Sequence, residues 1–130
     1  MAKGTATILL IEDDESLRRI VAGHLRGRGF RVEEAVSAEA AVASLQDGLR
    51  PALVLLDLNL PGDTGWDLLR GPELAWAGSP PVVITSATTV NPKRLAEFEV
   101  AGYLPKPFPL ETLIATIERL LTSERETEQA

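Results

Sequence analysis

The chain has 130 residues, 45% of them hydrophobic and 25% charged, which is ordinary for a single globular domain. A formal net charge of −6 argues against direct binding to nucleic acid, because phosphate backbones attract basic surfaces. The absence of cysteine excludes a disulfide scaffold and a thiolate metal site. No apolar run resembles the hydrophobic region of a signal peptide or approaches the roughly 20 residues that span a bilayer. We therefore expect a cytoplasmic protein that does not enter a membrane.

Short apolar runs alternate with longer amphipathic stretches along the chain. The runs occupy residues 6–11, 30–34, 53–57, 82–86 and 102–104. Their length and composition are typical of strands buried on both faces, as in a parallel sheet. The first helix is predicted over 16–28, where one face carries Leu17, Ile20, Val21, His24 and Leu25.

The other helices are expected between the remaining runs. Ser37 is the predicted N-cap of a helix over 38–46, and a strongly amphipathic helix is predicted over 110–122. Two weaker helices are expected over 65–77, where Gly71-Pro72 breaks or kinks the helix, and over 91–101.

This alternation predicts an α/β fold, in which right-handed crossovers build a doubly wound parallel sheet with helices on both faces. We expect one domain over residues 1–122. Residues 123–130 are expected to form a polar C-terminal tail that frays.

Polar residues gather where the predicted strands end. Glu12 to Asp14 follow the first run, Asp57 ends the third, Ser86 ends the fourth, and Lys106 follows the fifth. Ligands of open parallel sheets bind beyond the carboxyl ends of the strands. If the first and third strands are neighbours, about 4.8 Å apart, then Asp13, Asp14 and Asp57 share one pocket.

Such a carboxylate cluster calls for a cation, and Mg²⁺ prefers oxygen ligands. Asp57 is then either a metal ligand only or also a nucleophile that accepts a phosphoryl group, as carboxylates do in covalent catalysis. In the second case Lys106 pairs with a phosphoryl oxygen, and Ser86 donates a hydrogen bond to another.

Four segments together resemble the receiver domain of response regulators in two-component signalling. They are Ile8-Leu-Leu-Ile-Glu-Asp-Asp-Glu15, Leu55-Leu-Asp-Leu-Asn-Leu-Pro-Gly-Asp-Thr-Gly65, Pro81-Val-Val-Ile-Thr-Ser-Ala87 and Tyr103-Leu-Pro-Lys-Pro-Phe108. The resemblance covers residues 6–121. It implies a flavodoxin-like, five-stranded sheet of order 2-1-3-4-5.

The resemblance also implies the roles of individual residues. Asp57 accepts the phosphoryl group from a phosphohistidine. Asp13 and Asp14 hold Mg²⁺, Asp14 more directly, and the backbone carbonyl of Asn59 completes the protein ligands.

Three further positions match the family's motifs. Ser86 is the switch hydroxyl, and Tyr103 is the aromatic residue that follows it inward. Lys106 contacts the phosphoryl group, and its bond to Pro107 resembles the family's cis peptide. Thr85 offers the same hydroxyl one residue earlier. We favour Ser86, because it directly precedes a small alanine and keeps the family's spacing from Asp57.

The hypothesis is a phosphoacceptor response regulator that takes a phosphoryl group onto Asp57 with Mg²⁺ and signals by a conformational switch. Its expected partners are a sensor histidine kinase or histidine phosphotransfer protein and a downstream protein target. A homodimer through the fourth helix, fifth strand and last helix is a further expectation. One alternative is a Mg²⁺-dependent phosphatase with an aspartyl nucleophile, although Asn59 stands where such enzymes need a second acid. The other is a receiver excised from a hybrid kinase or larger regulator.

Overall fold

The computed structural model describes residues 6–60 and 64–129, with side chains as far as residue 122. Five strands and six helices alternate along these ranges. They are β1 (Thr7–Ile11), α1 (Glu15–Gly27), β2 (Arg31–Ala35), α2 (Ala38–Gln46), β3 (Leu53–Asp57), α3 (Gly65–Arg70), α4 (Glu73–Trp76), β4 (Val82–Ser86), α5 (Pro92–Glu97), β5 (Gly102–Pro105) and α6 (Leu110–Gln129). Residues 61–63 of the second family-like segment lie outside the described residues. No helix in the described ranges is both long and apolar enough to cross a membrane.

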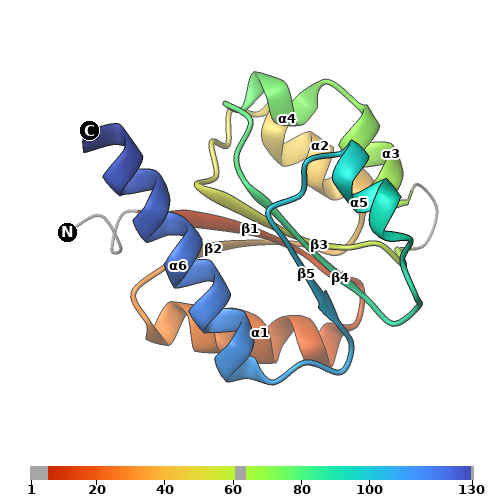
Figure 1. Cartoon of the computed structure of the whole chain (residues 1–130), viewed down its shortest axis with the longest axis horizontal. Helices are drawn as coiled ribbons and strands as arrows, with labels where there is room; N and C mark the ends of the chain where they lie inside the picture. The colour runs from red at the N-terminus through yellow and green to blue at the C-terminus, as the bar shows by residue number, and fades with distance from the viewer. Residues whose placement is uncertain (1–5, 61–63, 130) are drawn as a thin grey trace.

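The strands form one parallel sheet in the order β2-β1-β3-β4-β5, which confirms the predicted fold and strand order. Helices α1 and α6 cover one face, and α2, α3, α4 and α5 lie on the other (Figure 1). The strands alternate between the two faces. In β3, for example, Leu53 and Leu55 pack toward α1 and α6, whereas Val54 and Leu56 pack toward α2 and α3.

Local sequence accounts for where several helices begin. Ser37 caps α2 by accepting a hydrogen bond from Ala40 N, as predicted. Asp14 caps α1 by accepting a hydrogen bond from Leu17 N, which was not predicted. Thr64 and Asp67 form a capping box at the start of α3. Such caps satisfy amide groups that would otherwise lack partners in the first helical turn.

The region expected to form a third helix over 65–77 is divided into α3 and α4, as Gly71-Pro72 predicted. Proline has no amide hydrogen to continue the helical bonds, so α3 ends before it. The chain therefore leaves α3 at Gly71 and starts a new helical turn at Glu73.

Two helical expectations are wrong in detail. Within α1, Val21 and Leu25 are buried as expected, but Ile20 is 50% exposed and His24 is exposed, so the buried stripe is narrower than predicted. Helix α6 extends beyond residue 122, where the predicted helix ends, as far as Gln129. Residues 123–129 contain neither glycine nor proline and are rich in glutamate, which favours helix.

Candidate functional site

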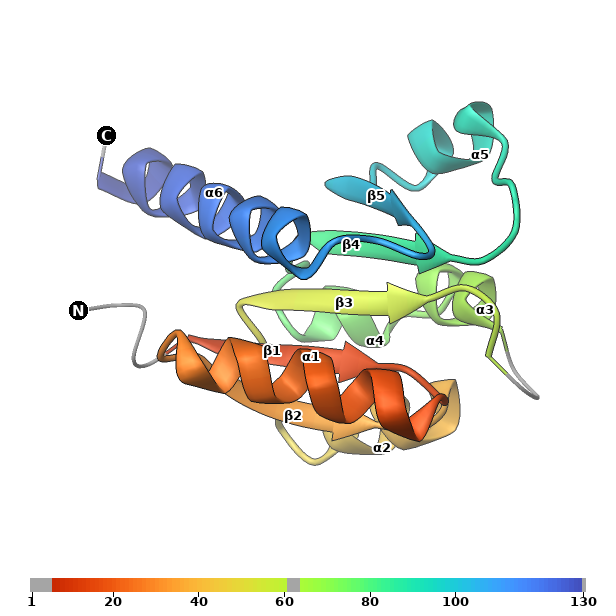
Figure 2. The same ribbon diagram turned by 90° about the horizontal axis from the view of Figure 1, so that it is seen from below.

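The carboxyl ends of the five parallel strands lie together along one edge of the sheet (Figure 2). Asp57 is the last residue of β3, at that edge, and is only 2% exposed. Its Oδ1 accepts a hydrogen bond from Asn59 N at 2.9 Å, and its Oδ2 lies 3.0 Å from Lys106 Nζ. One carboxylate oxygen of Asp57 is thus bonded to the loop after β3, and the other lies beside the ammonium group of Lys106.

Glu12 is a site residue that the sequence interpretation did not include. Its side chain is buried, with Oε1 at 2.7 Å from Lys106 Nζ and Oε2 accepting from Asp14 N at 3.1 Å. Burial raises the pKa of Glu12 to about 7, and the negative charge of Asp57 adds to that shift, against the lowering effect of the bonds from Lys106 and Asp14.

Three carboxylates meet in this structure: Glu12, Asp13 and Asp57. They offer oxygen atoms that all lie within 4.8 Å of one another, and Asp13 is the exposed member. We call these three residues with Lys106 the acidic pocket. A set of carboxylate oxygens of this kind fits a hard divalent cation such as Mg²⁺.

Asp14 was predicted to belong to this cluster, and the structure brings Glu12 together with Asp13 and Asp57 instead. The Asp14 carboxylate is engaged as the N-cap of α1, where its Oδ1 accepts from Leu17 N at 3.0 Å. Its backbone nitrogen faces the pocket and donates to Glu12. An aspartate three residues before the first apolar residue of an amphipathic helix is a recognisable cap signal, and it could have given this assignment.

Lys106 provides the positive charge of the pocket. Its backbone nitrogen donates to Ser86 O at 2.8 Å, which holds the residue beside the end of β4. Burial alone lowers the pKa of Lys106, but the bonds to Glu12 and Asp57 and their negative charges outweigh it, so this pKa is raised. The Lys106-Pro107 peptide is cis, as the family resemblance implied.

Ser86 ends β4 with its hydroxyl turned toward the loop that follows β3. Its Oγ donates to Asn59 Oδ1 at 2.9 Å and lies 3.0 Å from Thr88 O. Thr85 is paired in register with Asp57 and is also buried. The Ser86 hydroxyl therefore contacts both the loop after β3 and the loop after β4.

The side chain of Asn59 makes contacts that the sequence interpretation did not include. Its Oδ1 accepts from both Ser86 Oγ and Ala87 N, and its Nδ2 donates to Thr88 Oγ1 at 3.3 Å. The side chain therefore joins the loop after β3 to the loop after β4. The sequence interpretation missed this role and that of Thr88, because the pairing depends on how two loops meet in space.

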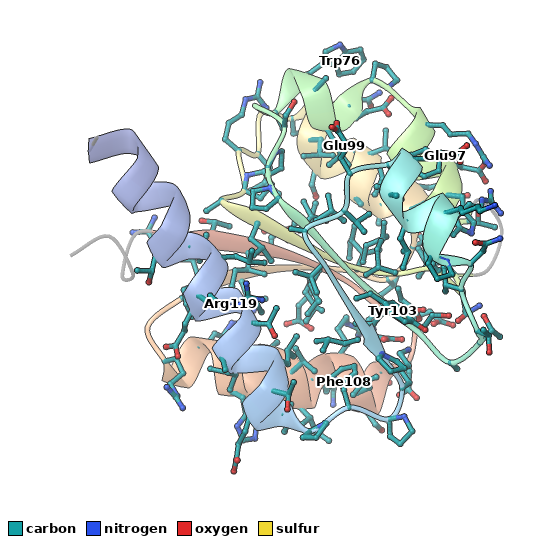
Figure 3. The ribbon with its side chains drawn as sticks, in the orientation of Figure 1. Trp76, Glu97, Glu99, Tyr103, Phe108 and Arg119 are labelled. Carbon is teal, nitrogen blue, oxygen red and sulfur yellow. The ribbon has the colours of Figure 1, made fainter. Side chains whose placement is uncertain are left out.

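Tyr103 lies half-buried in β5, close to the loop after β4 (Figure 3). Its hydroxyl donates to Thr88 O at 3.4 Å. Thr88 thus contacts Ser86, Asn59 and Tyr103. The predicted hydroxyl and aromatic residues are therefore linked through one residue of the intervening loop.

Comparison with known proteins assigns the chain to a family. Residues 8–118 match the response regulator receiver domain, and the chain belongs to this family. It is 39% identical over 124 residues to the transcriptional activator protein PfeR of Pseudomonas aeruginosa, covering 91% of this chain and 38% of that protein. It is 38% identical over 121 residues to the DNA-binding response regulator MtrA of Mycolicibacterium smegmatis, covering 92% and 52%. The chain thus spans about half the length of these relatives, or less.

A solved structure shows the same arrangement of strands and helices. The chemotaxis protein CheY4 of Vibrio cholerae superposes with a TM-score of 0.79 at 28% identity, covering 88% of this chain and 98% of that one. The family assignment and the fold therefore agree.

Proposed function

We propose that this chain accepts a phosphoryl group on Asp57 in a Mg²⁺-dependent reaction and passes the signal to a protein partner by changing shape. The observation that carries the proposal is the setting of Asp57, which is buried at the end of β3 between Lys106 and the carboxylates of Glu12 and Asp13. A buried carboxylate with a cation at one oxygen and a metal-binding cluster beside it suits the transfer of an anionic group.

The residues suited to hold Mg²⁺ are Asp13, Asp57 and the backbone carbonyl of Asn59, with Glu12 close by. When bound, Mg²⁺ neutralises negative charge on the phosphoryl oxygens. A carboxylate oxygen of Asp57 bonds to phosphorus while the bond from phosphorus to the donor's histidine nitrogen breaks. The electron pair of that bond leaves with the nitrogen. Lys106 then pairs with a phosphoryl oxygen.

The hydrogen bonds of Ser86 supply a route for the switch. A phosphoryl group on Asp57 offers Ser86 a charged acceptor that competes with Asn59 and Thr88. If Ser86 turns to that acceptor, the loop at Thr88 loses a partner, and Tyr103 contacts the same loop. The phosphoryl group thereby favours one of two arrangements of the face formed by α5, β5 and α6.

A direct test is to treat the protein with a small phosphodonor and Mg²⁺ and to measure its intact mass. We expect the mass to increase by one phosphoryl group and the increase to disappear with excess chelator. Asp57→Asn should abolish the uptake, and Asp47→Asn, at the exposed end of α2, should retain it. Equal uptake by Asp57→Asn and the wild type would refute the assignment of Asp57.

The exposed side of α1 is our proposed docking surface for the phosphodonor kinase or phosphotransfer protein. A shallow groove there is lined by Arg19, Ile20, Gly23, His24, Gly27 and Arg28. Ile20 is half exposed, and the two glycines place no side chain between α1 and an approaching helix. The basic residues suit an acidic partner, and α1 starts directly after the acidic pocket.

This docking proposal is tested with the histidine kinase that phosphorylates the wild type fastest in a panel. Ile20→Glu should slow transfer from that kinase about tenfold or more, because a charge replaces an apolar contact at the interface centre. Phosphorylation by the small donor should not change. Trp76→Glu is the matched control, since Trp76 is similarly exposed but lies on the opposite face. Equal effects of the two substitutions would exclude α1 as the docking surface.

A further inference from the structure

Arg18 lies on α1, four residues after Asp14, and its side chain is only 12% exposed. Its backbone nitrogen donates to Asp14 O at 2.8 Å, as in any helix. Its guanidinium reaches back over the same turn, and Nη1 donates to Glu12 O at 3.2 Å. Arg18 thus contacts both ends of the segment that carries Glu12 and Asp13.

A second contact fixes the direction of this guanidinium. Arg18 Nε donates to Glu34 Oε1 at 3.1 Å, and the other oxygen of Glu34 lies 3.1 Å from Arg26 Nη1. Arg26 also donates to Val32 O at 3.0 Å. Glu34 lies on β2, which pairs with β1 so that Ala35 O accepts from Glu12 N at 3.0 Å. The turn after β1 is therefore held by β2 through its backbone and through Arg18.

We infer that Arg18 is a positioning residue for the acidic pocket, acting through the backbone carbonyl of Glu12 and held in place by Glu34. The planar guanidinium donates in two directions at once, to Glu12 O and to Glu34, which a lysine ammonium on a flexible chain does not reproduce in this geometry. This inference rests on the proposed Mg²⁺-dependent function of the same pocket.

The expected consequence follows from the repulsion between the carboxylates. Glu12, Asp13 and Asp57 repel one another, and a turn that is free to relax separates them. Without the Arg18 contacts, the carboxylates must be brought together each time a cation binds, so the affinity for Mg²⁺ falls. Outer contacts that orient metal ligands typically contribute about 10- to 100-fold to metal affinity.

The test is Arg18→Lys, which keeps the charge but not the forked contact. We expect its Mg²⁺ dissociation constant, measured by calorimetry, to rise about tenfold. Without metal, amide hydrogen exchange at Asp13 and Asp14 should become faster. At saturating Mg²⁺ the phosphorylation rate with a small donor should return to within about twofold of the wild type, because Arg18 contacts neither Asp57 nor Lys106.

The matched control is Arg50→Lys. Arg50 also donates to backbone carbonyls, those of Leu45 and Leu49, but these belong to α2 and the loop that follows it. We expect Arg50→Lys to leave the Mg²⁺ affinity and exchange at Asp13 and Asp14 unchanged, even if its melting temperature falls. The same loss of Mg²⁺ affinity in both variants would overturn the positioning role.

Glu34→Gln gives a second test that does not alter Arg18 itself. It should weaken Mg²⁺ binding in the same direction by about threefold, because Arg18 loses the partner that directs it. The variant that carries both Arg18→Lys and Glu34→Gln should bind Mg²⁺ no more weakly than Arg18→Lys alone. An Arg18→Lys protein with wild-type Mg²⁺ affinity and exchange refutes the inference. A wild type that binds Mg²⁺ but takes up no phosphoryl group instead refutes the proposed function, because binding and exchange report on Arg18 independently.

Discussion

The acidic pocket and helix α5 are attached to the rest of the fold in different ways. The three carboxylates of the acidic pocket lie at the ends of β1 and β3, in which every strand residue except Thr7 is buried. Helix α5, six residues long, has no buried residue. It is attached by side-chain contacts with α3, where the rings of Trp66 and Phe98 lie 5.3 Å apart and Arg94 lies 4.2 Å above the Trp66 ring. The carboxylates of the pocket are therefore attached to more deeply buried elements than α5.

This difference suits a signalling domain. Elements that move in proteins come from regions with few buried apolar contacts, because such regions rearrange at small cost in free energy. Under the proposed function, Asp57 holds a metal and a phosphoryl group, and this requires the opposite, a fixed position. The contrast between the acidic pocket and α5 can be tested by substitutions that are alike in chemistry and differ only in place.

The largest effect on the free energy of unfolding is expected from Lys106→Met. This substitution removes the ammonium group that pairs with Glu12 and Asp57, so two buried carboxylates are left without a positively charged partner. We expect the free energy of unfolding without metal at pH 7 to fall by about 3 kcal/mol. Lys93→Met, at an exposed position of α5, should change it by less than about 0.5 kcal/mol. Denaturant titrations give both values, and similar losses would contradict the contrast.

The next effect is a pH dependence that comes from Glu12. Its pKa rises on folding from an ordinary 4.5 to about 7, chiefly through burial, so the folded protein keeps a proton that the unfolded chain loses. Stability without metal should therefore fall as the pH rises from 4.5 through 7, by an amount of the order of 2 kcal/mol from this group. Thermal unfolding of the wild type and Glu12→Gln checks this, since the variant should lack that slope. Parallel pH profiles would show that Glu12 is ionised in both states.

A smaller loss of stability is expected from Phe98→Leu, which weakens the contact between α5 and α3. Phe98→Leu removes the ring contact with Trp66 and the Arg70 contact, in which Cζ lies 5.9 Å from the ring centroid. Such aromatic pairs contribute about 1 kcal/mol. We expect a loss of that size and faster hydrogen exchange in α5, with phosphorylation by a small donor unchanged. A marked loss of phosphorylation would mean that α5 also supports the acidic pocket.

The smallest effect is expected from Trp76→Phe. Trp76 is 57% exposed and points away from α4 (Figure 3), so the substitution should alter stability by less than about 0.5 kcal/mol. It leaves Trp66 as the only tryptophan and makes its fluorescence a report on the α3–α5 contact. That signal should change on phosphorylation, and Ser86→Ala should reduce the change while Asp57 is still phosphorylated. An unchanged response in Ser86→Ala would exclude Ser86 as the link to α5.

Much of the site was predictable from local features of the sequence. Asp57, Ser86 and Lys106 follow apolar runs, and parallel strands bring their carboxyl ends to one edge of the sheet. Glu12 was not predictable in this way, because a glutamate is normally exposed. Its burial depends on the ammonium group of Lys106, 94 residues away along the chain. The sequence interpretation chose Asp14 rather than Glu12 for the cluster, although both residues follow the same strand.

The sequence by itself determined the alternation of strands and helices, the break at Gly71-Pro72 and the edge of the sheet where the chemistry lies. These features follow from hydrophobic periodicity and backbone geometry, which act over a few residues. The tertiary structure decided which acids meet and the place of Arg18 between Glu12 and Glu34. These outcomes depend on charges and hydrogen-bond partners that folding brings together from distant segments, and no local pattern encodes them.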